Sequence, residues 1–227
     1  SGLVGSELCI RDRLFWKDVE DLTLTAACAP PGGGRQEVTP RFIRHFRQLC
    51  VPVPQDSVMQ KIFQSIVDGF LAGFSPEFGR MGKPMVESTI EIFNRISQEL
   101  LPTPAKSHYT FNLRDISKVF QGILLIKARN CEDKDCMVRL WIHENLRIFH
   151  DRLINDEDKM YFKVMVHELA QKRLDCQYNF EETFVDRQIL FGDYLKMGAS
   201  GDDRFYQEVT DLKKLNKLLG DYLDEYN

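Results

Sequence analysis

Residues 112–124, NLRDISKVFQGIL, contain both a helix start and a helix face. Asn112 is a common helix-capping residue, and Asp115 stands three positions later, where a capping box places its acidic partner. Apolar side chains then recur every three to four residues, as on the buried face of an amphipathic helix. They are Leu113, Ile116, Val119, Phe120, Ile123 and Leu124. The stretch therefore predicts a helix that starts at Asn112 and packs one face into a core.

Apolar residues at the same spacing predict further helices on both sides of this stretch. These helices cover about residues 58–71, 86–100, 138–153, 155–169 and 211–222. The face expected to be buried in the first of them comprises Val58, Ile62, Phe63, Ile66, Val67, Phe70 and Leu71. The fold class predicted from this pattern is mainly α.

Three short segments carry β-type or mixed patterns. Residues 22–28, LTLTAAC, are β-branched, apolar or small, which predicts a buried strand. Residues 188–191 predict a second short strand before Gly192. Residues 41–46 alternate charged and apolar side chains, and this pattern fits either a helical turn or a short strand.

The composition narrows the function classes. With 227 residues, 43% of them hydrophobic, and a net charge of −4, the chain is typical of a globular protein with a real core rather than a disordered one. The slight acidity argues against a general nucleic-acid binder, which neutralises phosphates with Lys and Arg. No apolar window approaches the length of a membrane span, and residues 1–7 lack the pattern of a signal peptide. The six cysteines include no C-x-x-C pair. Disulfide frameworks are typical of small secreted chains that lack a core, and the adequate core expected here favours free thiols in a reducing cytosol.

Arginines cluster between residues 35 and 47, where Arg35, Arg41, Arg44 and Arg47 face only one acidic residue, Glu37. Arginine offers a planar charged fork that suits phosphate or carboxylate, so the cluster suggests an anionic partner. The alternative is a surface patch that pairs with acids on a neighbouring surface.

Arg114 stands in the first turn of the predicted helix, where the helix dipole disfavours a cation. Its position makes sense if an anion occupies the same place. The alternative is an exposed arginine, or one bonded to Asp115.

Motifs for a complete catalytic site are absent from the sequence. There is no G-x-x-x-x-G-K-[ST] phosphate loop and no G-x-S-x-G motif. His143, His150 and His167 could build a metal enzyme, but solvent-facing or hydrogen-bonded histidines account for them more simply. No metal site is predicted.

Five stretches resemble axonemal dynein heavy chains, and the first three resemble the third AAA+ module of those proteins. They are residues 26–35 (AACAPPGGGR), 39–46 (TPRFIRHF), 101–118 (LPTPAKSHYTFNLRDISK), 149–153 (FHDRL) and 222–227 (YLDEYN). The resemblance implies three parts. Residues 1–50 would be the rear of the large α/β subdomain, with the first-sensor strand and the arginine-finger region. Residues 51–178 would be the helical lid, and residues 179–227 would begin the next module, before its P-loop.

The resemblance also implies roles for single residues. Arg114 matches the second sensor, a lid arginine that reaches the γ-phosphate of the module's own nucleotide. Arg41 and Arg44 fall where the family carries an arginine finger, and the sequence does not choose between them. Ala29 falls at the first-sensor position, where a polar residue would orient the attacking water. Since alanine cannot do so, slow turnover or a regulatory nucleotide is favoured at this site.

For the whole heavy chain, the resemblance implies an ATP-driven, minus-end-directed microtubule motor of the ciliary axoneme, within the cytoplasm and cytoskeleton, that uses ATP or ADP with Mg²⁺. Its partners would be neighbouring AAA+ modules, microtubules and other dynein chains, with no nucleic acid and no membrane. This chain by itself is expected to hold no nucleotide and to be no catalyst. A rival hypothesis is a stand-alone helical interaction module whose arginine-rich patch binds an acidic protein.

Overall fold

The computed structural model describes residues 7–9, 16–18, 21–28, 38–131, 133–186, 189–195 and 204–226. The chain divides between Val53 and Pro54 into two compact units. Unit 1 comprises residues 1–53 and unit 2 comprises residues 54–227, and each is described by itself below.

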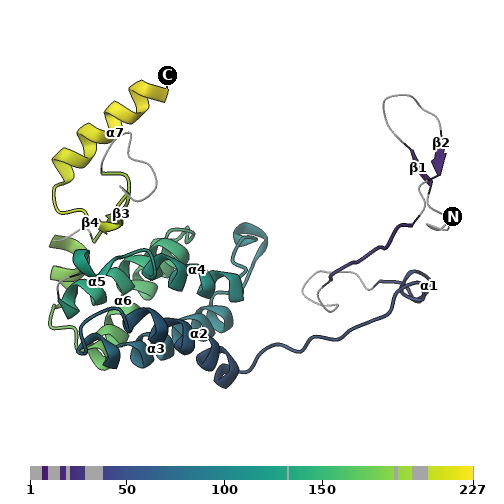
Figure 1. The fold of residues 1–227 in the computed structure, drawn as a ribbon, viewed down its shortest axis with the longest axis horizontal. Coiled ribbons are helices and arrows are strands. Elements are labelled where there is room, and N and C mark those ends of the chain that lie inside the picture. The colour runs from purple at the N-terminus through teal and green to yellow at the C-terminus, as the bar shows by residue number, and fades with distance from the viewer. Residues whose placement is uncertain are drawn as a thin grey trace. The chain divides into compact units, whose positions relative to one another are not determined.

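Unit 1 contains little regular structure among its described residues. Strands β1 (Glu7–Cys9) and β2 (Trp16–Asp18) pair in antiparallel fashion, with Leu8 opposite Lys17 (Figure 1). Helix α1 (Pro40–Ile43) is a single turn, which settles the ambiguous pattern after residue 40 in favour of a helical turn.

The strand predicted for residues 22–28 is wrong. These residues are irregular and exposed, with Leu24 63% accessible. A strand that is apolar on both faces belongs inside a sheet, where neighbours cover it. In the described part of this chain, no strand pairs with residues 22–28, so the pattern has nothing to pack against.

Unit 2 is built mainly from helices, which confirms the predicted fold class (Figure 1). Its α-helices are α2 (Asp56–Leu71), α3 (Gly82–Glu99), α4 (Leu113–Ile123), α5 (Lys134–Asn145), α6 (Asp156–Leu174) and α7 (Leu212–Tyr226). Shorter helical turns are η1 (Phe78–Arg80), η2 (Pro104–Lys106) and η3 (Ala128–Asn130). Two π-helical stretches, η4 (Leu146–His150) and η5 (Glu182–Asp186), follow α5 and α6. None of the helices in the described ranges combines the length and apolarity needed to cross a membrane.

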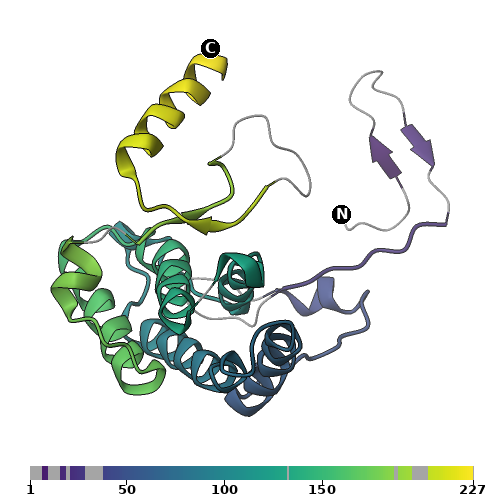
Figure 2. The same cartoon turned by 60° about the vertical axis from the view of Figure 1, so that its left-hand side comes forward.

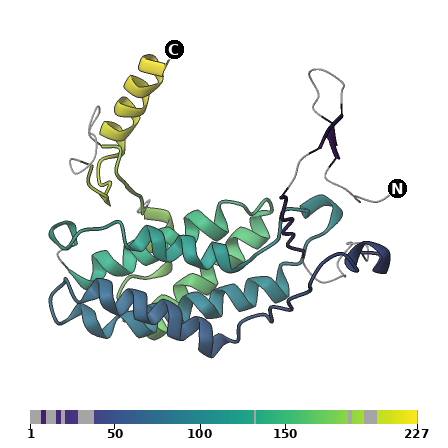
Figure 3. The ribbon, with the colours of Figure 1, turned by 45° about the vertical axis from the view of Figure 1, so that its right-hand side comes forward.

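The core of unit 2 lies between the layer of α2 and α3 and the layer of α4 and α5, with α6 alongside (Figure 3). Trp141 on α5 is fully buried, and its indole N–H donates to Thr89 Oγ1 on α3 at 2.9 Å. The Thr89 hydroxyl in turn donates to the carbonyl of Met85 at 2.8 Å, so the buried polar atoms are paired. Phe63 on α2 stacks on Phe120 on α4, with ring centroids 4.9 Å apart.

The predicted buried face of α2 is only half right. Met59, Phe63, Val67 and Leu71 are buried, whereas Val58, Ile62 and Ile66 are 45–51% exposed. The helix carries two adjacent apolar stripes, each at four-residue spacing, and only the one that begins at Met59 packs against α3 and α4. Periodicity alone does not say which stripe finds a partner.

The polypeptide after α6 returns to pack on the helices. Strands β3 (Phe191–Gly192) and β4 (Gln207–Glu208) pair antiparallel, with Phe191 opposite Glu208. β3 falls at the end of the strand predicted for residues 188–191, of which Gln188 lies outside the described residues. Helix α7 follows β4 and extends away from the α2–α6 helices (Figure 2).

Candidate functional site

Arg152, just after η4, organises the loop that leads into α4. Its guanidinium pairs with the carboxylate of Asp115 at 2.8 Å and donates to the carbonyl of Thr110 at 3.3 Å. It also donates to the carbonyl of Ile148 at 3.1 Å and lies over the Phe111 ring, 5.3 Å from its centroid. One side chain thus ties the start of α4 to the end of η4. It also brings together residues 101–118 and 149–153, two of the stretches quoted above for their resemblance.

The start of α4 has the predicted capping box. The Asn112 side chain accepts from the backbone N–H of Arg114 at 2.9 Å, and Asp115 accepts from the N–H of Asn112 at 3.0 Å. The Asp115 carboxylate therefore accepts a hydrogen bond from the helix start and also pairs with Arg152.

Arg114 is left exposed as a consequence. Its guanidinium forms no ion pair with any described residue, and Asp115, its nearest candidate in sequence, is engaged elsewhere. A cation without an ion-pair partner in the first turn of a helix, where the helix dipole favours negative charge, is suited to an anionic ligand.

The loop before α4 is anchored a second time, to the first turn of α6. Lys106 pairs with Asp158 at 2.5 Å, and the Tyr109 hydroxyl donates to the same carboxylate at 2.9 Å. The hydrogen bond from Lys106, ahead of that from Tyr109, holds the pKa of Asp158 below its ordinary value. Tyr109 is buried, and its hydroxyl accepts from the N–H of Ile154 at 2.9 Å. The loop and the helix start that carry Arg114 are therefore held in place by Arg152 and by Asp158.

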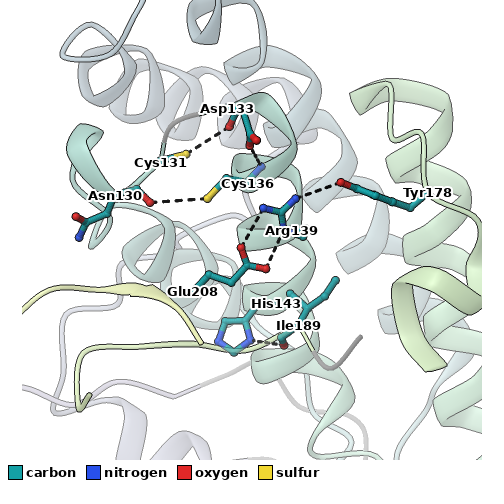
Figure 4. A network of polar contacts seen from close by, with 9 residues as sticks. All are labelled: Asn130, Cys131, Asp133, Cys136, Arg139, His143, Tyr178, Ile189 and Glu208. Carbon is teal, nitrogen blue, oxygen red and sulfur yellow. Dashed lines mark hydrogen bonds and ion pairs between the residues drawn. The ribbon is translucent and has the colours of Figure 1, made fainter. Parts of the chain in front are cut away.

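A second cluster fixes the segment of residues 204–209, here called the C-terminal joint, to α5 (Figure 4). Arg139 donates two hydrogen bonds to the carboxylate of Glu208, each 2.9 Å long. Burial opposes the charge on Arg139, but the hydrogen bond to Glu208 and its negative charge raise the pKa of the guanidinium overall. Asn130 donates to the carbonyl of Tyr206 at 3.2 Å, and Ile126 forms a parallel bridge with Tyr206.

The joint also reaches a carboxylate in the core. Glu144 on α5 is fully buried, accepts from the Tyr206 hydroxyl and pairs with Arg147 at 2.6 Å. Burial and the bond to Glu144 raise the pKa of Tyr206. Gly122 on α4 lies against this carboxylate so closely that an added Cβ would meet a Glu144 oxygen at 1.9 Å.

Two family models match the chain. The AAA+ lid domain matches residues 85–183, and the P-loop containing dynein motor region matches residues 9–54. Dynein axonemal heavy chain 6 of Homo sapiens is 49% identical over 217 residues, which are 96% of this chain and 5% of that protein. Dynein axonemal heavy chain 12 of Mus musculus is 43% identical over 220 residues, 91% of this chain and 7% of that protein. Dynein axonemal heavy chain 3 of Homo sapiens is 41% identical over 221 residues, 92% of this chain and 5% of that protein.

The chain belongs to the axonemal dynein heavy chain family. It spans 5–7% of the length of these relatives. In this dynein chain the lid match contains both Arg114 and Arg152, and most of α3 together with α4–α6 forms its body.

The other predicted site residues of the dynein chain lie in unit 1, within the motor-region match. Arg41 and Arg44 are exposed on and just after α1, and Arg44 donates to the ring of His45 at 3.3 Å. Ala29, at the predicted first-sensor position, lies outside the described residues.

The histidines named for a metal enzyme act as hydrogen-bonding or core residues. His143 Nδ1 lies 3.3 Å from the carbonyl of Ile189, and burial lowers the pKa of His143. His167 packs edge-on against Phe180, 5.6 Å between ring centroids. In the ranges described, no three His, Cys, Asp or Glu side chains gather in a group that could hold a metal ion.

Sequence reasoning missed Arg152 and the pair of Arg139 and Glu208. Arg152 stands 37 residues after Asp115, and Glu208 stands 69 residues after Arg139. No local spacing connects such partners. The one signal in the sequence was that residues 101–118 and 149–153 both resemble the same family, and no shared site was predicted from it.

Proposed function

We propose that this chain is part of the motor ring of a ciliary dynein, an ATP-driven, minus-end-directed microtubule motor of the axoneme. Within that ring it senses the nucleotide of one AAA+ module, the third, and couples that module to the fourth. The partners of the chain are the neighbouring modules of the same heavy chain. Microtubules and other dynein chains are partners of the whole protein.

The observation that carries the sensing role is that Arg114 forms no ion pair with any residue that the structure describes. Asp115 would neutralise Arg114 if it were free, but it is held by Arg152 and by the capping box. The charge of Arg114 is thereby kept available, at a helix start whose dipole also favours an anion. We assign it the part of the second sensor, which contacts the γ-phosphate of ATP.

The residues of the chain fit one part of a nucleotide site. Arg114 suits a phosphate oxygen, since a guanidinium forms strong charge-assisted hydrogen bonds with it. The phosphate loop and the acidic Mg²⁺-binding motif are absent from these 227 residues, so other parts of the heavy chain must hold ATP and Mg²⁺. When bound, the nucleotide supplies the charge that Arg114 detects.

In unit 1, we assign Arg41 or Arg44 the part of the arginine finger that reaches the nucleotide of the preceding module. Both side chains are exposed. At the first-sensor position, Ala29 has no polar group to orient water, which favours a regulatory nucleotide or slow turnover in the third module.

The C-terminal joint supports the coupling role. Residues 204–209 are bonded to α5 by Arg139–Glu208 and by Tyr206–Glu144, and both contacts are part-buried. We assign residues 179–227 to the start of the fourth module, so the joint belongs to that module, and movement of the lid pulls directly on it.

The test is Arg114→Ala in the intact heavy chain, with Lys118→Ala as the matched control. Lys118 is also an exposed cation, one turn along the same helix. We expect Arg114→Ala to slow ATP-dependent microtubule gliding while Lys118→Ala glides at the normal speed. Equal gliding speeds for both variants and the unmodified motor would contradict the sensing role.

The same assay distinguishes the finger candidates. Arg41→Ala and Arg44→Ala are made singly, and the finger is the residue whose loss lowers ATP turnover. If neither variant differs from the unmodified motor, the finger assignment is wrong.

A further inference from the structure

Two thiols lie together beside the C-terminal joint. Cys131 follows η3 and Cys136 stands in the first turn of α5, and their sulfur atoms are neighbours (Figure 4). The Cys131 thiol contacts the carbonyl of Asp133 at 3.7 Å, and the Cys136 thiol contacts that of Asn130 at 3.9 Å. Both are free thiols, 3% and 7% exposed. One short loop therefore holds both sulfurs in the same small volume.

The two thiols have opposite acid–base character. Hydrogen bonding to Cys131 is the largest cause that lowers the pKa of Cys136, and the nearby Arg139 charge lowers it further against the opposing effect of burial. Hydrogen bonding to Cys136, followed by burial, raises the pKa of Cys131. Cys136 also lies at a helix N-terminus, where backbone N–H groups favour a thiolate. Cys136 is thus suited to be a nucleophile, with Cys131 as the neighbouring proton donor.

Cys176 shows what an ordinary buried cysteine of this chain looks like. It is 7% exposed, as Cys136 is, but burial raises its pKa. Similar burial with the opposite shift indicates that the arrangement around Cys136 is specific to the pair.

We propose that Cys131 and Cys136 are a reversible thiol–disulfide site, which closes by exchange with a small disulfide such as oxidised glutathione. The Cys136 thiolate attacks one glutathione sulfur, the glutathione S–S bond breaks, and one glutathione leaves as a thiolate that takes up a proton. Cys131 then loses its proton and attacks Cys136 Sγ. The Cys131–Cys136 bond forms, and the second glutathione leaves. Overall, two protein thiols are oxidised and one glutathione disulfide is reduced to two glutathione thiols.

Each of the two cysteines lies close in the chain to a residue that holds the C-terminal joint. Asn130, next to Cys131, holds Tyr206, and Arg139, one turn after Cys136, holds Glu208. A disulfide would bind η3 to α5, the two elements that hold residues 204–209.

The test is to equilibrate the 227-residue chain in mixtures of reduced and oxidised glutathione. Cys9, Cys28 and Cys50 are first changed to serine, so that Cys131, Cys136 and Cys176 remain. After acid quenching, alkylation with N-ethylmaleimide and digestion with trypsin, the pair lies on two neighbouring peptides, residues 130–134 and 135–139. Because the readout is an equilibrium, slow opening of the buried loop does not affect it.

We expect a linked species of the two peptides that increases with the oxidised fraction and disappears when reduced glutathione is restored. Cys176 should remain alkylated throughout. The proposal is overturned if Cys131 and Cys136 remain separately alkylated in excess oxidised glutathione, or if they link only in denaturant.

A second variant separates the two roles. With Cys131→Ser in the same background, the resolving thiol is missing, and we expect Cys136 to retain a single glutathione while Cys176 retains none. Equal modification of Cys136 and Cys176 would contradict the nucleophile assignment. If this variant fails to fold, the linked-peptide measurement on the unaltered pair still decides the proposal.

Discussion

Arg152→Ala tests whether the loop before α4 is held as described. The change removes the partner of Asp115, whose side chain is 5% exposed, and leaves that carboxylate with the N–H of Asn112. Loss of one partner from a fully buried ion pair costs about 3–5 kcal/mol. Because the Arg152 side chain is 27% exposed, water replaces part of the loss, and we expect the lower end, about 3 kcal/mol. For a unit of this size, that lowers the melting temperature by about 6–12 °C.

The assay is urea unfolding followed by the fluorescence of Trp141, which is buried in unit 2. The sequence has two tryptophans, so Trp16→Phe leaves a single reporter for unit 2 and avoids mixing the unfolding of the two units. Arg152→Lys keeps the charge but not the planar fork that bonds Asp115 and Thr110 together, so we expect an intermediate loss.

Arg114→Ala is the matched comparison, because it removes an arginine from the same region that has no ion-pair partner among the described residues. We expect its free energy of unfolding to change by about 0.5 kcal/mol or less. Removal of a cation from a helix N-terminus should, if anything, stabilise the helix slightly. If Arg114→Ala costs as much as Arg152→Ala, or if Arg152→Ala costs below about 1 kcal/mol, the division between a structural and a sensing arginine is wrong.

Three further predictions concern the C-terminal joint and the core. Arg139→Ala should speed amide exchange over residues 204–209 about tenfold, from the loss of roughly 1.4 kcal/mol, and adding Glu208→Ala should speed it no further if the two act as one pair. Gly122→Ala should destabilise unit 2 by about 1–3 kcal/mol in the same urea assay, since the added Cβ would meet a buried carboxylate. Gly69→Ala should stabilise unit 2 by about 0.5–1 kcal/mol, because no atom lies within 4 Å of the added Cβ and alanine favours the helix. Because burial lowers the pKa of His143, the unfolded chain binds the proton more readily than the folded chain. The free energy of unfolding should therefore fall as the pH drops below 6.5, the ordinary pKa of histidine. His143→Gln should flatten the dependence of the unfolding free energy on pH in the urea assay, and an unchanged dependence would show that another group is responsible.

The parts that could be predicted from the sequence are those set by neighbours in the chain. The start of α4 follows from Asn112 and Asp115, three residues apart, and the structure confirms both the cap and its partner. The buried face of α4 follows from the helical period in the same way. Each of these features is satisfied inside a dozen residues, so no tertiary information is needed.

The parts that could not be predicted depend on distant partners. Residues 22–28 have the composition of a buried strand, but a strand is stable only beside another, and none of the described residues pairs with them. Val58, Ile62 and Ile66 share a helix with a buried stripe, yet they are 45–51% exposed. The availability of Arg114 depends on Arg152, which the spacing around Asp115 does not reveal.

The most direct test of the account compares ATP with ADP in the intact motor. An arginine that contacts the γ-phosphate distinguishes the two nucleotides, because ADP lacks that group. A charge-assisted hydrogen bond is worth about 1.5–3 kcal/mol, so Arg114→Ala should weaken ATP binding at the third module about 10- to 150-fold. The affinity for ADP should stay the same, and Lys118→Ala should affect neither. Unchanged ATP affinity, or an equal loss for ATP and ADP, would contradict the assignment of Arg114 as the phosphate sensor.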